Sequence, residues 1–241
     1  MRKLIFVIGI LMGLMTAPMV MADTVSITRV SGYYGSAGEF TIFPSFPVPS
    51  DYVPGKTSGI GGAGSPNFQS FCLEAREYVD VPGGPYAAVL NNGAVYGDGG
   101  GSGSYDPLSV GAAWLYYQFQ LGILSGYDYT LPGRGSSADA LQKAIWYLEG
   151  ESGGVNNSYV ALAISQFGTL AGAQADNLQS GERQIPVMVL NLWEIGHVGE
   201  SGYQHQDQLV CTPVPEPATM FLLGSGLIGL AGYGRKKFSR K

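Results

Sequence analysis

The sequence predicts an α+β fold in which a β-sandwich or barrel-like core carries a helical insert. Stretches of alternating apolar and polar residues lie near both ends of the middle of the chain, and apolar residues at helical spacing lie between them. Strands and helices are therefore grouped, which argues against alternating βαβ units. About 190 residues are enough for one well-buried core, so we expect a single domain over residues 23–210.

The first elements are predicted to be strands. Thr24 to Val30 alternates between apolar and polar residues, as do Glu39 to Phe43 and the stretch around Phe71. Residues 47–66 are rich in Pro, Gly and Ser, and residues 97–104 are mostly Gly, Ser and Asp. Both compositions are typical of loops.

Helices are expected next. Asp106 and Pro107 have the pattern of an N-cap and a first-turn proline, before apolar residues at helical spacing as far as Leu121. Ser136 and Asp139 have the pattern of a capping box that opens a second helix. That helix is expected to end at Gly150 and to have a core face made of Leu141, Ala144, Ile145 and Leu148.

A third helix is predicted around Tyr159 to Phe167. Residues 186–193 and 206–210 then return to strand character and complete the domain.

Residues 1–22 have the composition of a signal peptide. Arg2 and Lys3 precede a short apolar run, and small residues precede Asp23. The run is too short for a membrane anchor, since a spanning helix needs about 20 apolar residues. We expect signal peptidase to cleave between Ala22 and Asp23, so that the mature chain is secreted.

The other end of the chain has three parts. A linker over residues 211–217 contains Pro215, Glu216 and Pro217, and an apolar stretch follows from Ala218 to Gly234. The chain then closes with a basic cluster made of Arg235, Lys236, Lys237, Arg240 and Lys241. The apolar stretch is long enough to span a bilayer, and the positive-inside rule would keep the basic tail cytoplasmic. Residues 218–241 are thus predicted to form a transmembrane helix with a basic tail.

This C-terminal arrangement resembles the PEP-CTERM sorting signal of Gram-negative bacteria. The resemblance implies that an exosortase recognises the chain while it is transiently anchored in the inner membrane, and that the tail is then removed. It further implies release or attachment at the cell surface, commonly in bacteria that make exopolysaccharide and a biofilm. A permanent C-terminal anchor is the alternative, because both outcomes use the same bilayer physics.

The charge of the middle region excludes one class of partner. Seven of the 13 Lys and Arg residues lie in the two terminal signals, which leaves six basic residues against 18 acidic ones, a formal charge of −12. Phosphate backbones are bound by Lys and Arg, so we expect no nucleic-acid partner.

Residue sets typical of a turnover enzyme or a strong metal site are not apparent in the sequence. His197 and His205 have no partner at zinc spacing, and no base accompanies a nucleophile. Asp98 and Asp106 flank a Gly-rich loop, but two carboxylates are few for calcium. We therefore expect no catalytic residues, no metal and no cofactor.

Two short motifs carry a second resemblance. Phe71-Cys72-Leu73 is a strand-like stretch, and Leu141-Gln-Lys-Ala-Ile-Trp146 lies on the predicted second helix. Together they resemble the thioester domains of bacterial surface adhesins, as do the blocks at residues 112–116, 158–163 and 206–210. The resemblance implies an internal thioester between the sulfur of Cys72 and the side-chain carbonyl of Gln142.

Physical chemistry suggests how such a bond would be formed and protected. A thiolate adds slowly to an amide, so the two groups must be held together near fixed hydrogen-bond donors. Gln142 lies beside the core face of its helix, and we expect it to remain near the surface. Trp146, one turn later, and Phe71 are predicted to shield the bond from water. Glu74 and Glu77 either assist proton transfer or are solvated charges.

The predicted function is that of a single-use adhesin: an amine on a target surface or matrix attacks the Gln142 acyl carbon, and Cys72 leaves. Such a protein is not a turnover enzyme. Three alternatives remain open from the sequence. Cys72 forms a disulfide with Cys211, both remain free thiols, or the protein is a non-covalent structural or glycan-binding component of the extracellular matrix.

Overall fold

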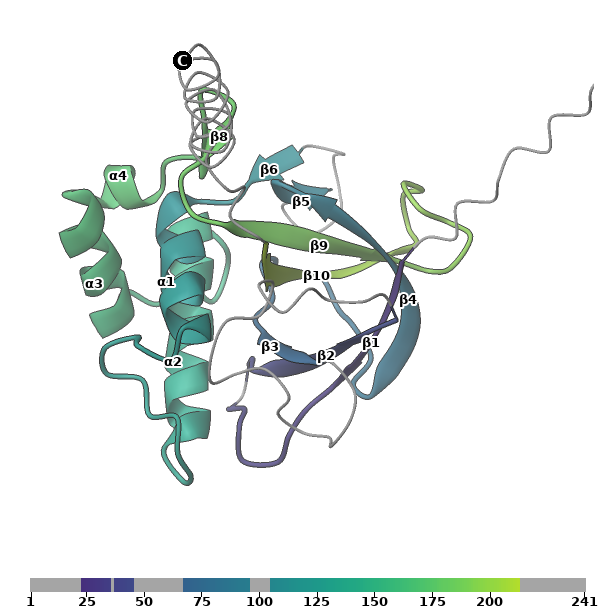
Figure 1. Ribbon diagram of the computed structural model, residues 1–241, viewed down its shortest axis with the longest axis horizontal. Coiled ribbons are helices and arrows are strands. Elements are labelled where there is room, and N and C mark those ends of the chain that lie inside the picture. The colour runs from purple at the N-terminus through teal and green to yellow at the C-terminus, as the bar shows by residue number, and fades with distance from the viewer. Residues whose placement is uncertain (1–22, 36, 46–66, 96–104, 213–241) are drawn as a thin grey trace, which may run out of the picture.

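The computed structural model describes residues 23–35, 37–45, 67–95 and 105–212. It confirms the α+β class: a curled antiparallel sheet forms a half-barrel, and the helices pack on one side of it (Figure 1). The predicted signal peptide, both Gly-rich loops and the sorting segment lie outside these ranges. Within the described ranges, no helix is long and apolar enough to cross a membrane.

The main sheet has six strands in the order β10-β9-β4-β1-β2-β3, and all neighbouring strands are antiparallel. Its strands are β1 (Thr24–Thr28), β2 (Phe40–Pro44), β3 (Phe68–Ser70), β4 (Gly83–Asn91), β9 (Val187–Trp193) and β10 (Gln204–Cys211). Two small pairs accompany it: β5 (Gly93–Val95) with β6 (Tyr105–Pro107), and β7 (Leu178–Gln179) with β8 (Glu182–Arg183). The strands predicted from alternation are all present, with ends shifted by a few residues.

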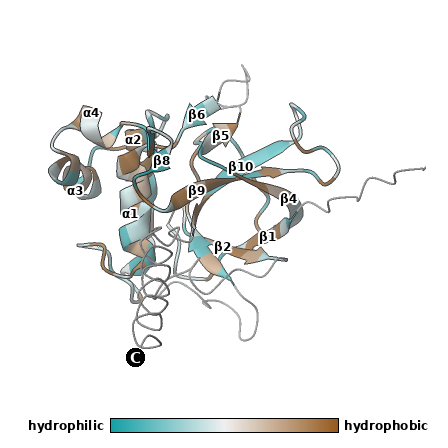
Figure 2. Ribbon diagram, turned by 45° about the horizontal axis from the view of Figure 1, so that its top comes forward, coloured by the Kyte–Doolittle hydropathy of each residue, from teal (hydrophilic) through white to brown (hydrophobic). Residues whose placement is uncertain are grey.

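Alternating side chains divide the core into two parts. Val25, Ile27 and Leu190 belong to a cluster enclosed by the curl of the sheet, around which the strands curve in Figure 2. Val189 and Leu209 face the other way and join the cluster formed with the helices. Because successive strand residues point to opposite faces, one sheet supplies both clusters.

The two outer strands of the sheet meet at one point. Beyond β3, Leu209 N–H donates to the Phe71 carbonyl at 3.0 Å, and Leu73 N–H donates to the Asp207 carbonyl at 3.0 Å. Cys72 is paired with Gln208 between these two bonds. We call residues 71–73 and 207–209 the seam, because they join β3 to β10 and close the curl there.

The helices are α1 (Val110–Gln120), α2 (Arg134–Glu149), α3 (Ser158–Phe167) and the short α4 (Leu170–Ala173). The core face predicted for α2 is buried, and Gly150 ends this helix in the left-handed conformation with a φ of 78°. The helix predicted at Tyr159 to Phe167 is also confirmed.

Two predicted helix starts are wrong. Asp106 and Pro107 belong to β6, because they pair with β5, and Ser109 caps α1 by accepting a bond from Ala112 N–H. Likewise α2 begins at Arg134, two residues before the predicted capping box, and Asp139 lies inside the helix, where it pairs with Lys143 at 2.6 Å. In both cases the local capping pattern competes with pairing or packing that the sequence alone does not reveal.

Candidate functional site

Cys72 lies on the seam with its backbone polar groups turned away from β10. The flanking residues Phe71 and Leu73 make the hydrogen bonds to β10, so the N–H and C=O of Cys72 face the opposite side. On that side β2 no longer provides a partner, because its pairing with β3 ends at Ser70. The fold therefore leaves one buried donor and one buried acceptor to be satisfied by another group.

Gln142 of α2 satisfies both. Its Oε1 accepts from Cys72 N–H at 3.0 Å, and its Nε2 donates to the Cys72 carbonyl at 2.8 Å. The sulfur of Cys72 is 3.2 Å from the same Oε1. The structure thus brings the two residues of the predicted thioester into direct contact. Gln142 is fully buried, so the expectation that it stays near the surface is wrong, because the seam packs over it.

Burial raises the pKa of the Cys72 thiol well above its ordinary value. The positive charge of Arg29 and the indole N–H of Trp146 lower the pKa of this thiol, but by less than burial raises it. Burial at this position therefore favours the neutral thiol over the thiolate.

Trp146, the predicted shield, lines the same pocket as Cys72. Trp146 is half-buried and packs against the cluster inside the curl, and its indole N–H has no hydrogen-bond partner among the described residues. Phe71 occupies a different position. Its ring faces the helices and packs edge-on against the Phe119 ring, with 5.1 Å between the two ring centroids. It still borders the site, since Phe71 and Gln142 Oε1 both lie against Gly38.

Gly38 fits closely against the glutamine carbonyl. A Cβ added there would lie 2.9 Å from Gln142 Oε1 and 2.7 Å from the Phe71 ring, and the φ of Gly38 is +47°. Both the space and the backbone angle require glycine at this position.

A pocket of about 400 Å³ leads to the cysteine. Its walls include Arg29, Gly38, Cys72, Tyr78 and Trp146, and Tyr78 is 82 % exposed. A small nucleophile therefore has a route to the Cys72 side of the contact, whereas Gln142 is covered by protein.

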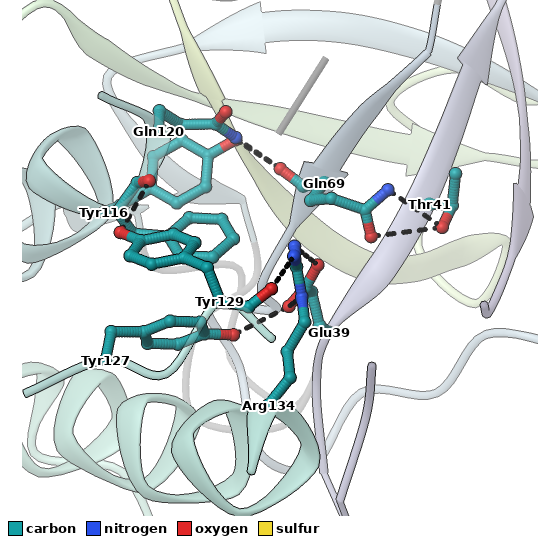
Figure 3. A network of polar contacts seen from close by, with 9 residues as sticks. Glu39, Thr41, Gln69, Tyr116, Gln120, Tyr127, Tyr129 and Arg134 are labelled. Carbon is teal, nitrogen blue, oxygen red and sulfur yellow. Dashed lines mark hydrogen bonds and ion pairs between the residues drawn. The ribbon is translucent and has the colours of Figure 1, made fainter. Parts of the chain in front are cut away.

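A polar network anchors α2 against the sheet (Figure 3). Arg134, the first residue of α2, forms a buried ion pair with Glu39 at 2.7 Å, and Tyr127 donates to the same carboxylate at 2.7 Å. Burial raises the pKa of Glu39, although Arg134 and Tyr127 lower it. The tyrosine hydroxyl of Tyr116 donates to the Gln69 carbonyl at 2.9 Å and ties α1 to β3. These bonds tie α2, which carries Gln142, to the segment before β2, and tie α1 to β3, the strand that leads to Cys72.

Glu74 and Glu77 are not solvated charges. Both are buried, and burial raises the pKa of Glu74 to about 9 and that of Glu77 to about 7. Sequence reasoning missed their burial because it depends on β10: Asp207 N–H donates to Glu77, and the side chain of Gln206 donates to the carbonyls of Glu74 and Glu77.

Cys211 lies apart from Cys72. Both cysteines are free and buried, but Cys72 belongs to the cluster inside the curl and Cys211 to the cluster beneath the helices. They occupy opposite faces of the closed sheet, so this arrangement does not favour the disulfide alternative.

Comparison with known proteins identifies the end of the chain. A family profile for the PEP-CTERM protein-sorting motif matches residues 213–236, which include Pro215, Glu216, Pro217 and the first two residues of the basic cluster. No curated protein and no solved structure matches the chain. The matched motif supports a secreted bacterial protein that is sorted to the cell surface and processed by an exosortase.

Proposed function

We propose that Cys72 and Gln142 form an internal thioester with which this surface-sorted protein, an adhesin, captures amines covalently. Two groups of Cys72 contact Gln142 Oε1: the backbone N–H at 3.0 Å and the sulfur at 3.2 Å. These two contacts carry the proposal. The resemblance of the two motifs to adhesin thioester domains agrees with it.

The bond would form by displacement of ammonia. The sulfur of Cys72 adds to the side-chain carbonyl carbon of Gln142, and the bond between this carbon and Nε2 breaks. The thiol proton leaves with the amide nitrogen, so that a thiol and an amide give a thioester and one ammonia. No oxidant and no external acid is needed, which suits a neutral, buried thiol.

The seam provides the stabilisation that this step needs. As the sulfur adds, negative charge develops on Gln142 Oε1, to which Cys72 N–H already donates. A fixed donor aimed at developing charge in a buried site is an effective form of transition-state stabilisation. The sulfur lies 3.2 Å from the oxygen of the same carbonyl group, so the two groups already share one site and a bimolecular encounter is not needed.

Capture would reverse the roles of the two residues. An amine that enters the pocket approaches the thioester from the Cys72 side and attacks its acyl carbon, the C–S bond breaks, and Cys72 leaves as a thiolate that takes the amine proton. The positive charge of Arg29, which lowers the pKa of Cys72, favours this leaving group. The product is an amide bond made once per molecule, so the protein acts as a single-use adhesin.

A second candidate rests on the hydrogen bonds themselves. Gln142 bonds both backbone groups of Cys72, as a structural side chain that replaces a missing strand would do. In that case the protein is a non-covalent structural or glycan-binding component of the extracellular matrix.

The intact mass of the purified protein distinguishes the two. The adhesin has a native mass one ammonia below that of its sequence, and methylamine restores the mass as an adduct on Gln142 while Cys72 becomes open to alkylation. A Cys72→Ala variant should show neither effect, and a Cys211→Ala variant should show both. A full native mass in freshly purified protein, with no methylamine adduct, would leave the structural role. A mass two hydrogens low that only a reductant restores would mean a disulfide.

A further inference from the structure

Three carboxylates gather beside the seam. Glu74, Asp106 and Glu151 each place an oxygen within 4.8 Å of the others. They come from three separate parts of the chain: the segment after the seam, strand β6 and the turn after α2. Like charges this close disfavour one another's ionised forms, and a proton or a cation relieves the repulsion.

Glu74 is the least compensated member of this cluster. Its side chain is fully buried, and neither carboxylate oxygen has a hydrogen-bond partner. Among the described residues, the ion pairs of Glu39, Asp139 and Glu200 involve neither Glu74 nor Glu151. An isolated buried carboxylate is costly, so a buried one normally has a partner or ligates a metal.

The electrostatic surroundings agree with the geometry. Burial, the negative charges of Glu151, Glu77 and Asp106, and contact with the Glu151 carboxylate together raise the pKa of Glu74 to about 9. Two arrangements relieve such a cluster: a proton held by Glu74, or a cation held by all three carboxylates.

We propose that Glu74, Asp106 and Glu151 bind a calcium ion. The donor atoms are all carboxylate oxygens, which hard cations prefer. The three oxygens lie within 4.8 Å of one another, so one cation can contact all three. Calcium accepts irregular sets of oxygen ligands completed by water, whereas magnesium demands near-ideal octahedral geometry, so the site favours calcium. Asp106 and Glu151 are half-buried, so the site is reachable from solvent and has room for water ligands.

The ion would hold together the two parts of the chain that meet at Cys72. Glu74 follows Cys72 by two residues, and Glu151 follows the helix that carries Gln142. Glu151 already accepts from Ala75 N–H at 3.1 Å, so the turn after α2 contacts this segment directly. Calcium binding does not depend on the thioester, and a Cys72→Ala variant should bind the ion equally well.

Thermal unfolding tests the proposal. Purified protein is treated with EGTA and compared with the same protein in 10 mM calcium chloride or 10 mM magnesium chloride. For a dissociation constant of about 0.1 mM, typical of extracellular calcium modules, Tm should rise by about 5–10 °C in calcium. Magnesium should have a much smaller effect.

Two variants make the test specific. Glu74→Gln preserves the shape of the side chain but removes one charge, so it should lose most of the calcium response without losing stability in EGTA. Glu194→Gln, at an exposed position, should respond as the parent does. An unchanged Tm in calcium would overturn the proposal and favour a proton on Glu74. A response that Glu74→Gln retains, or one as large in magnesium, would also overturn the assignment.

Discussion

The N–H and the sulfur of Cys72 approach the same atom, Oε1 of Gln142, at 3.0 and 3.2 Å. One residue therefore presents both a nucleophile and a donor for the charge that its attack would create. This is possible because the seam turns the backbone of Cys72 away from β10 and toward α2. Gln142 receives both groups on a helix that the Glu39–Arg134 pair anchors to the sheet.

Gln142→Glu should abolish the chemistry without changing the shape of the site. The variant has no amide nitrogen to lose as ammonia, and its mass should equal that of its sequence with no methylamine adduct. It also loses the donor to the Cys72 carbonyl, and the free energy of unfolding should fall by about 1–3 kcal/mol.

Gln120→Glu is the matched control. Gln120 is another buried helical glutamine, and its amide donates to the Gln69 carbonyl and the Tyr116 hydroxyl. This variant should lose stability to a similar extent but retain the ammonia deficit and the methylamine adduct. A deficit lost in both variants would indicate general disruption rather than loss of the acyl group.

Trp146→Phe should expose the thioester to water. The smaller ring opens the pocket beside the sulfur and removes the only polar group of the indole, so hydrolysis should accelerate roughly tenfold, which corresponds to about 1.4 kcal/mol of barrier. The decay of the ammonia mass deficit over time measures this rate of hydrolysis. Trp193 lies on β9, and its indole N–H is likewise buried without a hydrogen-bond partner. The control variant Trp193→Phe should leave the rate of thioester hydrolysis unchanged.

Gly38→Ala should separate Cys72 from Gln142. The new Cβ would press on Gln142 Oε1 and the Phe71 ring and would also impose backbone strain, for a combined loss of about 1–3 kcal/mol of unfolding free energy. Less of the purified protein should then show the ammonia deficit. Gly168→Ala has a positive φ of +82° but no neighbour within 4 Å, so it should lose stability through strain alone and form the thioester normally.

Arg134→Met should be severely destabilising. It leaves Glu39 charged and buried, which costs about 3–5 kcal/mol, measured by denaturant unfolding. The double variant Glu39→Gln with Arg134→Met should recover part of the loss, because no unpaired charge remains. Lys143→Ala, which breaks the more exposed pair with Asp139, should cost less than about 1 kcal/mol. Equal costs for the two ion pairs would contradict this account.

Local patterns in the sequence predict much of the fold but not its closure. Alternation locates most strands, and helical spacing locates α2 and its buried face. Strand β4, at the centre of the sheet, was not predicted, because it begins with Gly-Gly-Pro and its burial does not alternate. The seam depends on contacts between residues more than 100 positions apart, for which a single sequence has no local signal.

The same limit applies to the site. The motifs around Cys72 and Gln142 predict their contact, and the structure brings the two residues together. The full burial of Gln142 follows from the closure at Asp207 to Leu209, and the burial of Glu74 and Glu77 follows from their contacts with the same strand. The position of Glu74, two residues after Cys72, is only a weak sequence signal for a buried carboxylate, because acidic residues are normally exposed.

The seam also has a mechanical consequence. Strand β10 is hydrogen-bonded to β9 on one side and to residues 71–73 on the other, and it leads through Thr212 into the sorting motif. Tension applied at the C-terminal end of β10 acts along the strand. The hydrogen bonds from β10 to β9 and to residues 71–73 are therefore loaded together in shear and are not broken one after another. A cell held to a target through Gln142 would thus pull on the part of the sheet that is best suited to bear the load.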